Sequence, residues 1–125
     1  MSAARLASSN RLLHGIKLLD KQNEIELRIA LEKRSSIQFE LQRLLKLIGE
    51  KNYADARLLL PWTRRIAKLS RDNKLIEEEL AHFRQKALKF SRSIDVLSQR
   101  IRAFQVDQQD EEMSDLLSSW VGQKF

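Results

Sequence analysis

Few side chains in the sequence could build a catalytic or metal-binding site. There is no cysteine, and the two histidines, His14 and His82, stand far apart in the chain. Without cysteine there is no disulfide, thiolate or cysteine-ligated zinc chemistry. The carboxylates of Glu77, Glu78 and Glu79 would diverge at about 100° steps around a helix. The three glycines are isolated and form no phosphate-binding loop. We therefore predict no catalytic residue, no metal ligand and no cofactor.

The composition indicates an all-α protein of one domain. The chain has 125 residues, of which 42% are hydrophobic, and only three glycines and one proline could mark turns. A mixture rich in Leu, Lys, Arg, Glu, Gln and Ala is typical of long helices. No apolar run approaches the roughly 20 residues of a membrane span, so we expect no direct membrane insertion. The absence of cysteine fits a reducing cytosol.

Apolar residues repeat with heptad spacing through the second half of the chain. A 3.5-residue period held for about six heptads is typical of a coiled-coil seam, because it keeps one narrow stripe facing a partner helix. Asn73 is the one polar member. The positions are Trp62, Ile66, Leu69, Asn73, Ile76, Leu80, Phe83, Ala87, Phe90, Ile94, Leu97, Ile101 and Phe104.

The first half carries a similar repeat with one interruption. Two consecutive four-residue steps around Asn23 predict a stutter, which would locally unwind the supercoil. Asn23, Arg34 and Asn73 would either hold the register of the seam or simply be tolerated in it. The predicted positions are Leu12, Ile16, Leu19, Asn23, Leu27, Ala30, Arg34, Ile37, Leu41, Leu44 and Ile48.

Gly49 and Pro61 predict where the chain reverses. Gly49 could supply the left-handed residue that ends a helix, and Pro61 could open the next helix. We therefore expect a single domain over residues 1–125, with helices over about 3–48 and 62–121 and a tip over about 49–61. The expected fold is a long two-helix antiparallel coiled-coil hairpin, which would place Leu27 near Phe83 and Ile16 near Ile94. Such a slender hairpin has no deep pocket for catalysis, so we expect no enzyme.

The cations predict the first of three interaction surfaces. The net charge of +6 favours an anionic partner such as an acidic protein surface, nucleic acid or lipid. Hairpin pairing would bring basic residues of both helices to one end. The alternative interpretation is that they serve only solubility there. This set, the basic cluster, comprises Arg5, Arg11, Lys17, Arg92, Arg100 and Arg102.

The second predicted surface lies in the stretch "MSDLLSSWVGQKF". Its apolar residues fall on one helical face beyond the reach of the first helix. This face predicts a partner-docking tail, unless the tail folds back on Leu6 and Leu13. Its members are Met113, Leu116, Leu117, Trp120 and Val121.

The third predicted surface is the hairpin tip around Pro61. The residue before a proline avoids the α region, so we expect Leu60 to leave helical geometry. Part of the apolar bulk would close the seam, and at least one leucine would stay exposed as a contact. The tip set is Leu58, Leu59, Leu60 and Trp62.

With its hairpin pattern and the stretch "LLKLIGEKNYADARLLL", the chain resembles the central-stalk proteins of bacterial type III secretion systems, of the FliJ, YscO and EscO type. In that stretch a Leu-rich helix ends near Gly49, and the leucines 58–60 follow a short polar tip. The resemblance implies a stalk that binds the hexameric secretion ATPase through its paired termini, stimulates or couples its activity, and turns the other tip toward the export gate. It also implies export chaperones as partners, and a place in the bacterial cytoplasm at the base of the secretion apparatus. The basic cluster would then be the ATPase-binding surface.

Two other interpretations also fit the sequence. The stretch "MSAARLASSNRLLHGIKLL" has Arg and Ser but no acid before Asp20, as a mitochondrial presequence would. Its cleavage would remove part of the seam. The other alternative is a basic coiled-coil scaffold or nucleic-acid-binding protein unrelated to secretion. We expect no nucleic acid as partner, because no aromatic residues interleave the basic cluster as stacking platforms.

Overall fold

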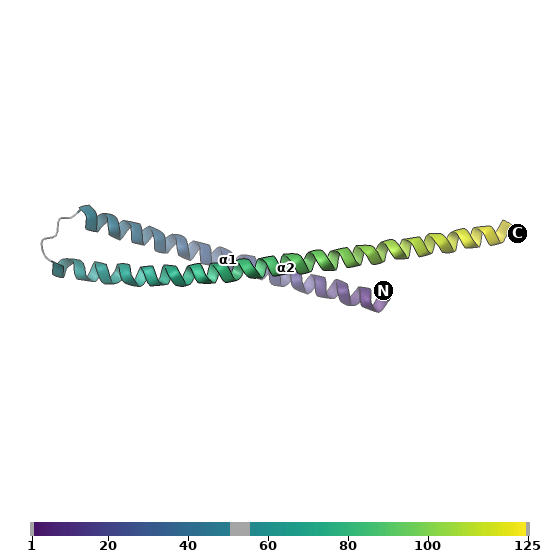
Figure 1. Ribbon diagram of the computed structural model, residues 1–125, viewed down its shortest axis with the longest axis horizontal. Helices are drawn as coiled ribbons and strands as arrows, with labels where there is room; N and C mark the ends of the chain where they lie inside the picture. Colours follow the sequence, from purple (N-terminus) through teal and green to yellow (C-terminus); the bar gives the residue numbers. More distant parts are fainter. Residues whose placement is uncertain (1, 51–55, 125) are drawn as a thin grey trace. The chain divides into compact units, whose positions relative to one another are not determined.

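Two long helices make up the structure. The computed structural model describes residues 2–50 and 56–124, with side chains for residues 2–50 and 59–122. Helix α1 spans Ala3–Glu50 and helix α2 spans Ala56–Lys124 (Figure 1). The described residues include no strand. No described helix has a stretch that is both long and apolar enough to cross a membrane. The predicted all-α hairpin is confirmed, while part of its predicted tip, residues 51–55, lies outside the described residues.

Helix α1 begins with a serine cap and continues through Gly49. The Ser2 hydroxyl accepts a hydrogen bond from the Arg5 backbone N–H at 3.3 Å. This bond satisfies one of the backbone donors that a helix N-terminus leaves without a partner. Gly49 is helical, and no described glycine has a positive φ. The prediction that Gly49 ends the helix in a left-handed conformation is therefore wrong.

Helix α2 begins before its proline. It starts at Ala56, so Leu60 and Pro61 both lie inside it. The predicted start at residue 62 is therefore wrong. The prediction that Leu60 leaves helical geometry is wrong as well. A proline inside a helix removes one backbone hydrogen bond, and its ring crowds the preceding turn. Only one turn of α2 precedes Pro61, so this disturbance is confined to the start of the helix. The Thr63 hydroxyl donates a hydrogen bond to the Leu60 carbonyl at 2.9 Å, adding a side-chain contact beside the proline. The short preceding turn is thus compatible with the proline.

The chain divides into two compact units, and the first to consider is Lys21–Ala87. Its polar contacts establish the direction of the two helices. Arg65 forms two hydrogen bonds with the Glu40 carboxylate, at 3.0 and 3.2 Å, and Arg34 bonds Glu77 at 3.3 Å. Arg34 precedes Glu40 on α1, whereas its partner Glu77 follows Arg65 on α2. The helices of this unit therefore run antiparallel.

A narrow apolar seam forms the core of the Lys21–Ala87 unit. Ala30, Ile76 and Leu80 are buried together, and Leu27 and Phe83 pack against them. This grouping agrees with the predicted pairing of Leu27 with Phe83. The α2 seam matches its prediction throughout the chain: Leu69, Ile76, Leu80, Leu97 and Ile101 are buried, and Trp62, Ile66, Asn73, Phe83, Ala87, Phe90, Ile94 and Phe104 are half-buried.

The seam of α1 follows one unbroken heptad repeat, so the predicted stutter is wrong. Leu13 and Asp20 are half-buried, whereas Leu12 is 55% exposed and Leu19 is 52% exposed. The steps of four and three therefore continue backwards from Leu27 without interruption. A half-buried Asp20 can keep its carboxylate in water. The inward-facing positions are Leu6, Ser9, Leu13, Ile16, Asp20, Asn23, Leu27, Ala30, Arg34, Ile37, Leu41, Leu44 and Ile48.

The second unit comprises Met1–Asp20 and Leu88–Phe125. In it, the first part of α1 lies beside α2, where Leu97 and Ile101 are buried. Helix α2 then runs past the N-terminal end of α1 (Figure 1). Among the side chains that the structure describes, Phe104 is the last half-buried one, and residues 105–122 are all exposed. The segment 105–122, called the tail below, is thus a stretch of α2 on which α1, as described over Ala3–Glu50, does not pack.

Candidate functional site

The titratable groups of the described residues form no reactive cluster. His14 and His82 are both exposed, and the His82 ring lies 6.1 Å from the Phe83 ring between centroids. In the ranges 2–50 and 56–124, no group of three or more His, Asp or Glu residues could hold a metal ion. Of the three consecutive glutamates, Glu77 is engaged by Arg34. These side chains provide no convergent site for acid–base or metal chemistry.

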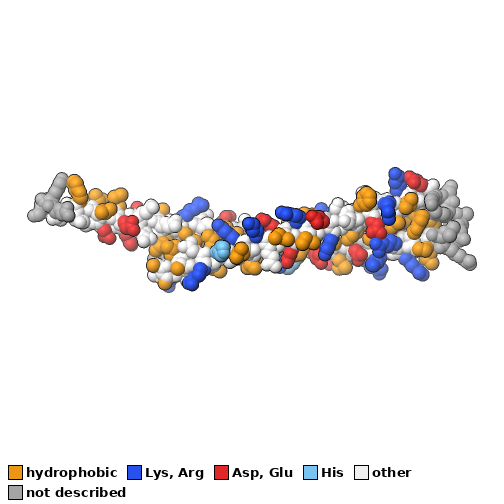
Figure 2. Space-filling model, turned by 180° about the vertical axis from the view of Figure 1, so that it is seen from behind, with side chains coloured by type: hydrophobic (Ala, Val, Ile, Leu, Met, Phe, Trp, Pro, Cys, Tyr) orange, Lys and Arg blue, Asp and Glu red, His pale blue; other side chains and the backbone are white. Residues whose placement is uncertain are grey.

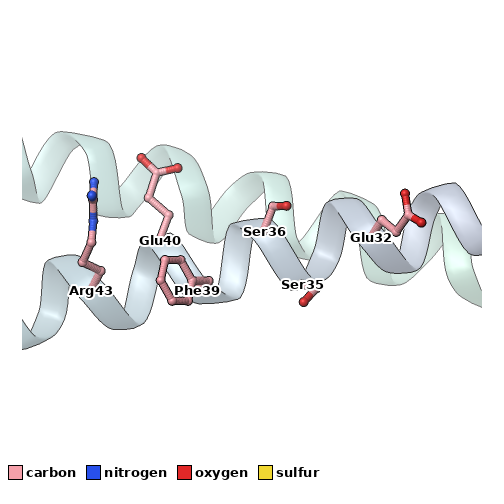
Figure 3. Close-up of a pocket in the computed structure, with 6 residues that line it drawn as sticks. All are labelled: Glu32, Ser35, Ser36, Phe39, Glu40 and Arg43. Atoms are coloured by element: carbon pink, nitrogen blue, oxygen red, sulfur yellow. The ribbon is translucent and has the colours of Figure 1, made fainter.

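One hollow in the Lys21–Ala87 unit lies on α1 alone. Figure 3 shows its six lining residues, with Ser35 extending to the opposite side of the helix from Ser36 and Glu40. Phe39 is 71% exposed there, and Glu40 already pairs with Arg65. Since a single helix cannot enclose a ligand, this is an open surface and not a binding pocket. Its lining residues are Glu32, Ser35, Ser36, Phe39, Glu40 and Arg43.

The basic groove, defined here by its lining, lies between the two helices in the other unit. It has a volume of about 310 Å³, and apolar side chains of both helices contribute to its lining. Arg92 and Arg100 stand two helical turns apart on α2 and line it together. Both are exposed. The lining residues are Leu12, Ile16, Arg92, Ser93, Val96, Leu97 and Arg100.

All six residues of the basic cluster are exposed in the unit that contains the groove. Only Arg92 and Arg100 line the groove itself. On α1, the Arg11 guanidinium donates a hydrogen bond to the Ser8 hydroxyl at 3.4 Å. None of the six forms an ion pair with another described residue. Cations that are not neutralised within the chain can attract an acidic surface.

The apolar face of the tail is exposed along its length. Met113 is 59% exposed, and Leu116, Leu117, Trp120 and Val121 are exposed to a similar degree. Helix α2 continues through them to Lys124, so the alternative in which the tail folds back on Leu6 and Leu13 is not observed. Contiguous apolar side chains on a solvent-facing helix are typical of partner contacts.

The predicted tip contact is only partly accessible. Leu59 and Trp62 are half-buried, whereas Leu60 is 47% exposed. The Leu58 side chain lies outside the described side chains. Leu60 is therefore an exposed leucine at this end of α2. This agrees with the prediction that at least one leucine of the tip stays exposed.

Sequence reasoning missed that Leu12 belongs to the groove and not to the seam. The doublet Leu12–Leu13 offers two apolar residues, and the choice between them depends on extending the register from Leu27 toward the N-terminus. That extension places Asp20 and not Leu19 at a seam position. A choice of the more hydrophobic residue at each seam position would favour Leu19 instead. The heptad count alone would have found the right register.

Comparison with known proteins gives no family assignment. The chain matches no protein-family model, no curated protein and no solved structure.

Proposed function

We propose that this protein is a central-stalk protein of a bacterial type III secretion system, located in the cytoplasm at the base of the apparatus. In this role it binds the hexameric secretion ATPase, stimulates or couples its activity, and links it to the export gate. Export chaperones are further candidate partners. The protein itself carries out no catalysis and acts by contact.

The observation that carries the proposal is the exposed basic cluster around an interhelical groove. Six cations from the two ends of the chain are exposed in one unit and engage no carboxylate among the described residues. An acidic surface on the ATPase would be attracted to such a cluster, with an association rate that falls as salt rises. The hairpin architecture and the leucines 58–60 are the features shared with the stalk proteins that the sequence resembles.

In the Lys21–Ala87 unit, Leu60 is the candidate contact for the export gate. It is exposed beside the half-buried Leu59 and Trp62. An exposed leucine supported by packed neighbours can enter an apolar pocket with little loss of side-chain freedom. The two contacts would then lie in different units of the chain.

The proposal predicts faster ATP hydrolysis when the protein is added to the cognate secretion ATPase. Replacing Arg100 and Arg102 by glutamate should abolish this stimulation, because repulsion replaces attraction at the contact. The variant Arg28→Glu/Arg71→Glu is the matched control, since both residues are exposed in the Lys21–Ala87 unit and the net charge changes equally. Steady-state ATPase assays over a concentration series of each variant make the measurement.

Two results would contradict the proposal. One is an ATPase rate that does not change on addition of the wild-type chain. The other is tight binding to duplex DNA with a steep salt dependence and no ATPase effect, which would favour the nucleic-acid alternative.

A further inference from the structure

Helix α2 carries a second apolar row, separate from the hairpin seam. The seam continues past Phe104 only as the polar residues Gln108, Glu111, Asp115 and Ser118. On a neighbouring face of α2, however, another heptad series runs from the groove into the tail through residues 96, 99, 103, 106, 110, 113, 117 and 120, of which Gln99 and Asp110 are polar. Its apolar members are all exposed, and we call it the outer row: Val96, Ala103, Val106, Met113, Leu117 and Trp120.

The outer row begins inside the basic groove. Val96 lines the groove together with Leu12 of α1, and both side chains are about half exposed. At the Val96 end, the outer row is thus bordered by residues of both helices, whereas along the tail it is formed by α2 alone. A helix lying along it would contact both α1 and α2 at the groove, and α2 alone along the tail.

Charge changes sign along this surface. Lys89, Arg92, Arg100 and Arg102 accompany its first half, and Asp95 is the one acid among them. Its second half has five acids and no base before Lys124. Figure 2 shows this change on the visible face, where basic side chains give way to acidic ones toward the end of α2. The acids are Asp107, Asp110, Glu111, Glu112 and Asp115.

We propose that the outer row binds a second copy of this chain in antiparallel orientation. The surface is complementary to itself only in that direction, because parallel copies would place acid on acid and base on base. Each tail then lies over the groove of the other copy, with Met113 of one chain opposite Val96 of the other. The acidic Asp107 of the tail then lies beside Arg100 of the other copy.

The charges flanking the row select one register. Arg100 and Asp107 occupy equivalent heptad positions, one heptad apart, on the same edge of the row. With Ala103 of one copy opposite Val106 of the other, each Arg100 faces an Asp107. A shift of one heptad in either direction brings Arg100 to Arg100 or Asp107 to Asp107, and like charges at flanking positions disfavour such alignments. This dimer depends on the chain alone and not on the ATPase.

Sedimentation velocity over a concentration series tests the dimer, using Arg100→Asp, Asp107→Arg and the double swap. Each single variant places like charges together at two symmetric contacts, so we expect its dimer dissociation constant to rise about tenfold or more. The double swap has the wild-type composition and should restore dimerisation. Mixing the two single variants should also restore it, as a heterodimer, which excludes misfolding as the cause of their defect.

The row itself is tested by Val106→Glu, which should also weaken the dimer. The matched control Gln105→Glu adds the same charge at an exposed neighbouring residue outside the row and should have a much smaller effect. Raising the salt concentration toward 1 M, where the Debye length is about 3 Å, should weaken wild-type association. A chain that stays monomeric, assembly that grows beyond dimers, or no rescue by the double swap would each overturn the proposal. Binding of an unrelated basic helix to the tail of a monomer would overturn it as well.

Discussion

Replacing Leu80 by alanine should lower the free energy of unfolding of the Lys21–Ala87 unit by about 2–4 kcal/mol. Leu80 has no exposed surface, and it is buried with Ala30 and Ile76. In a two-helix seam no third element can move in to fill the space that a truncated side chain leaves. The loss therefore includes both the burial of the removed carbons and the cavity that remains.

Urea denaturation followed by circular dichroism measures this effect. Leu75→Ala is the matched control, because Leu75 lies on the same helix and is 58% exposed. It should change the free energy of unfolding by about 0.5 kcal/mol or less. Equal losses for the two variants would show that the seam does not hold the hairpin together.

Replacing Asn23 by leucine should raise the free energy of unfolding by about 1–3 kcal/mol. Asn23 is 3% exposed in the seam, and its Nδ2 donates a hydrogen bond to the Phe83 carbonyl at 2.9 Å. Its Oδ1 is buried without a hydrogen-bond partner. Leucine removes this uncompensated acceptor and adds apolar burial, whereas the loss of one hydrogen bond costs only about 1 kcal/mol net.

The control for this prediction is Gln22→Leu, an exposed neighbour that should leave stability nearly unchanged. A lower stability for Asn23→Leu would mean that the bond to Phe83 outweighs the buried acceptor. A more stable variant should also have a less strictly defined register, because a buried asparagine penalises helix alignments that leave it without a partner. Cysteine pairs introduced across the seam and crosslinked in either register would detect that change.

The α2 seam could be predicted because apolar residues fill nearly every heptad position from Trp62 to Phe104. In α1 the same reasoning failed before Asn23, where leucine doublets offer two registers and the true one includes the polar Ser9 and Asp20. The structure follows the unbroken heptad repeat with a few polar seam residues, and not the interruption that would have placed Leu12 and Leu19 inside. Register is set by the whole seam, whereas ranking by hydrophobicity considers each residue alone.

The candidate surfaces were predictable in composition but not in arrangement. Charge and spacing identified the basic cluster and the tail from the sequence. The groove lined by Leu12 and Val96 depends on which leucine of a doublet faces inward, so it became visible only with the fold. The start of α2 was also misjudged, since a proline was taken as the first helical residue and one preceding turn proved compatible with it.

The tail has a further consequence for how the protein responds to proteases. Its helix is held by its own backbone hydrogen bonds and has no packed face, although packing supplies most of the stability of helices in proteins. Yet residues 103–123 contain no Lys or Arg, so trypsin finds no cleavage site there whether the helix is formed or open. A protease that cuts after glutamate can instead act at Glu111 and Glu112. We expect the tail to survive tryptic digestion as a single peptide and to be cut early by the glutamate-specific enzyme, at a rate that falls when a partner covers it.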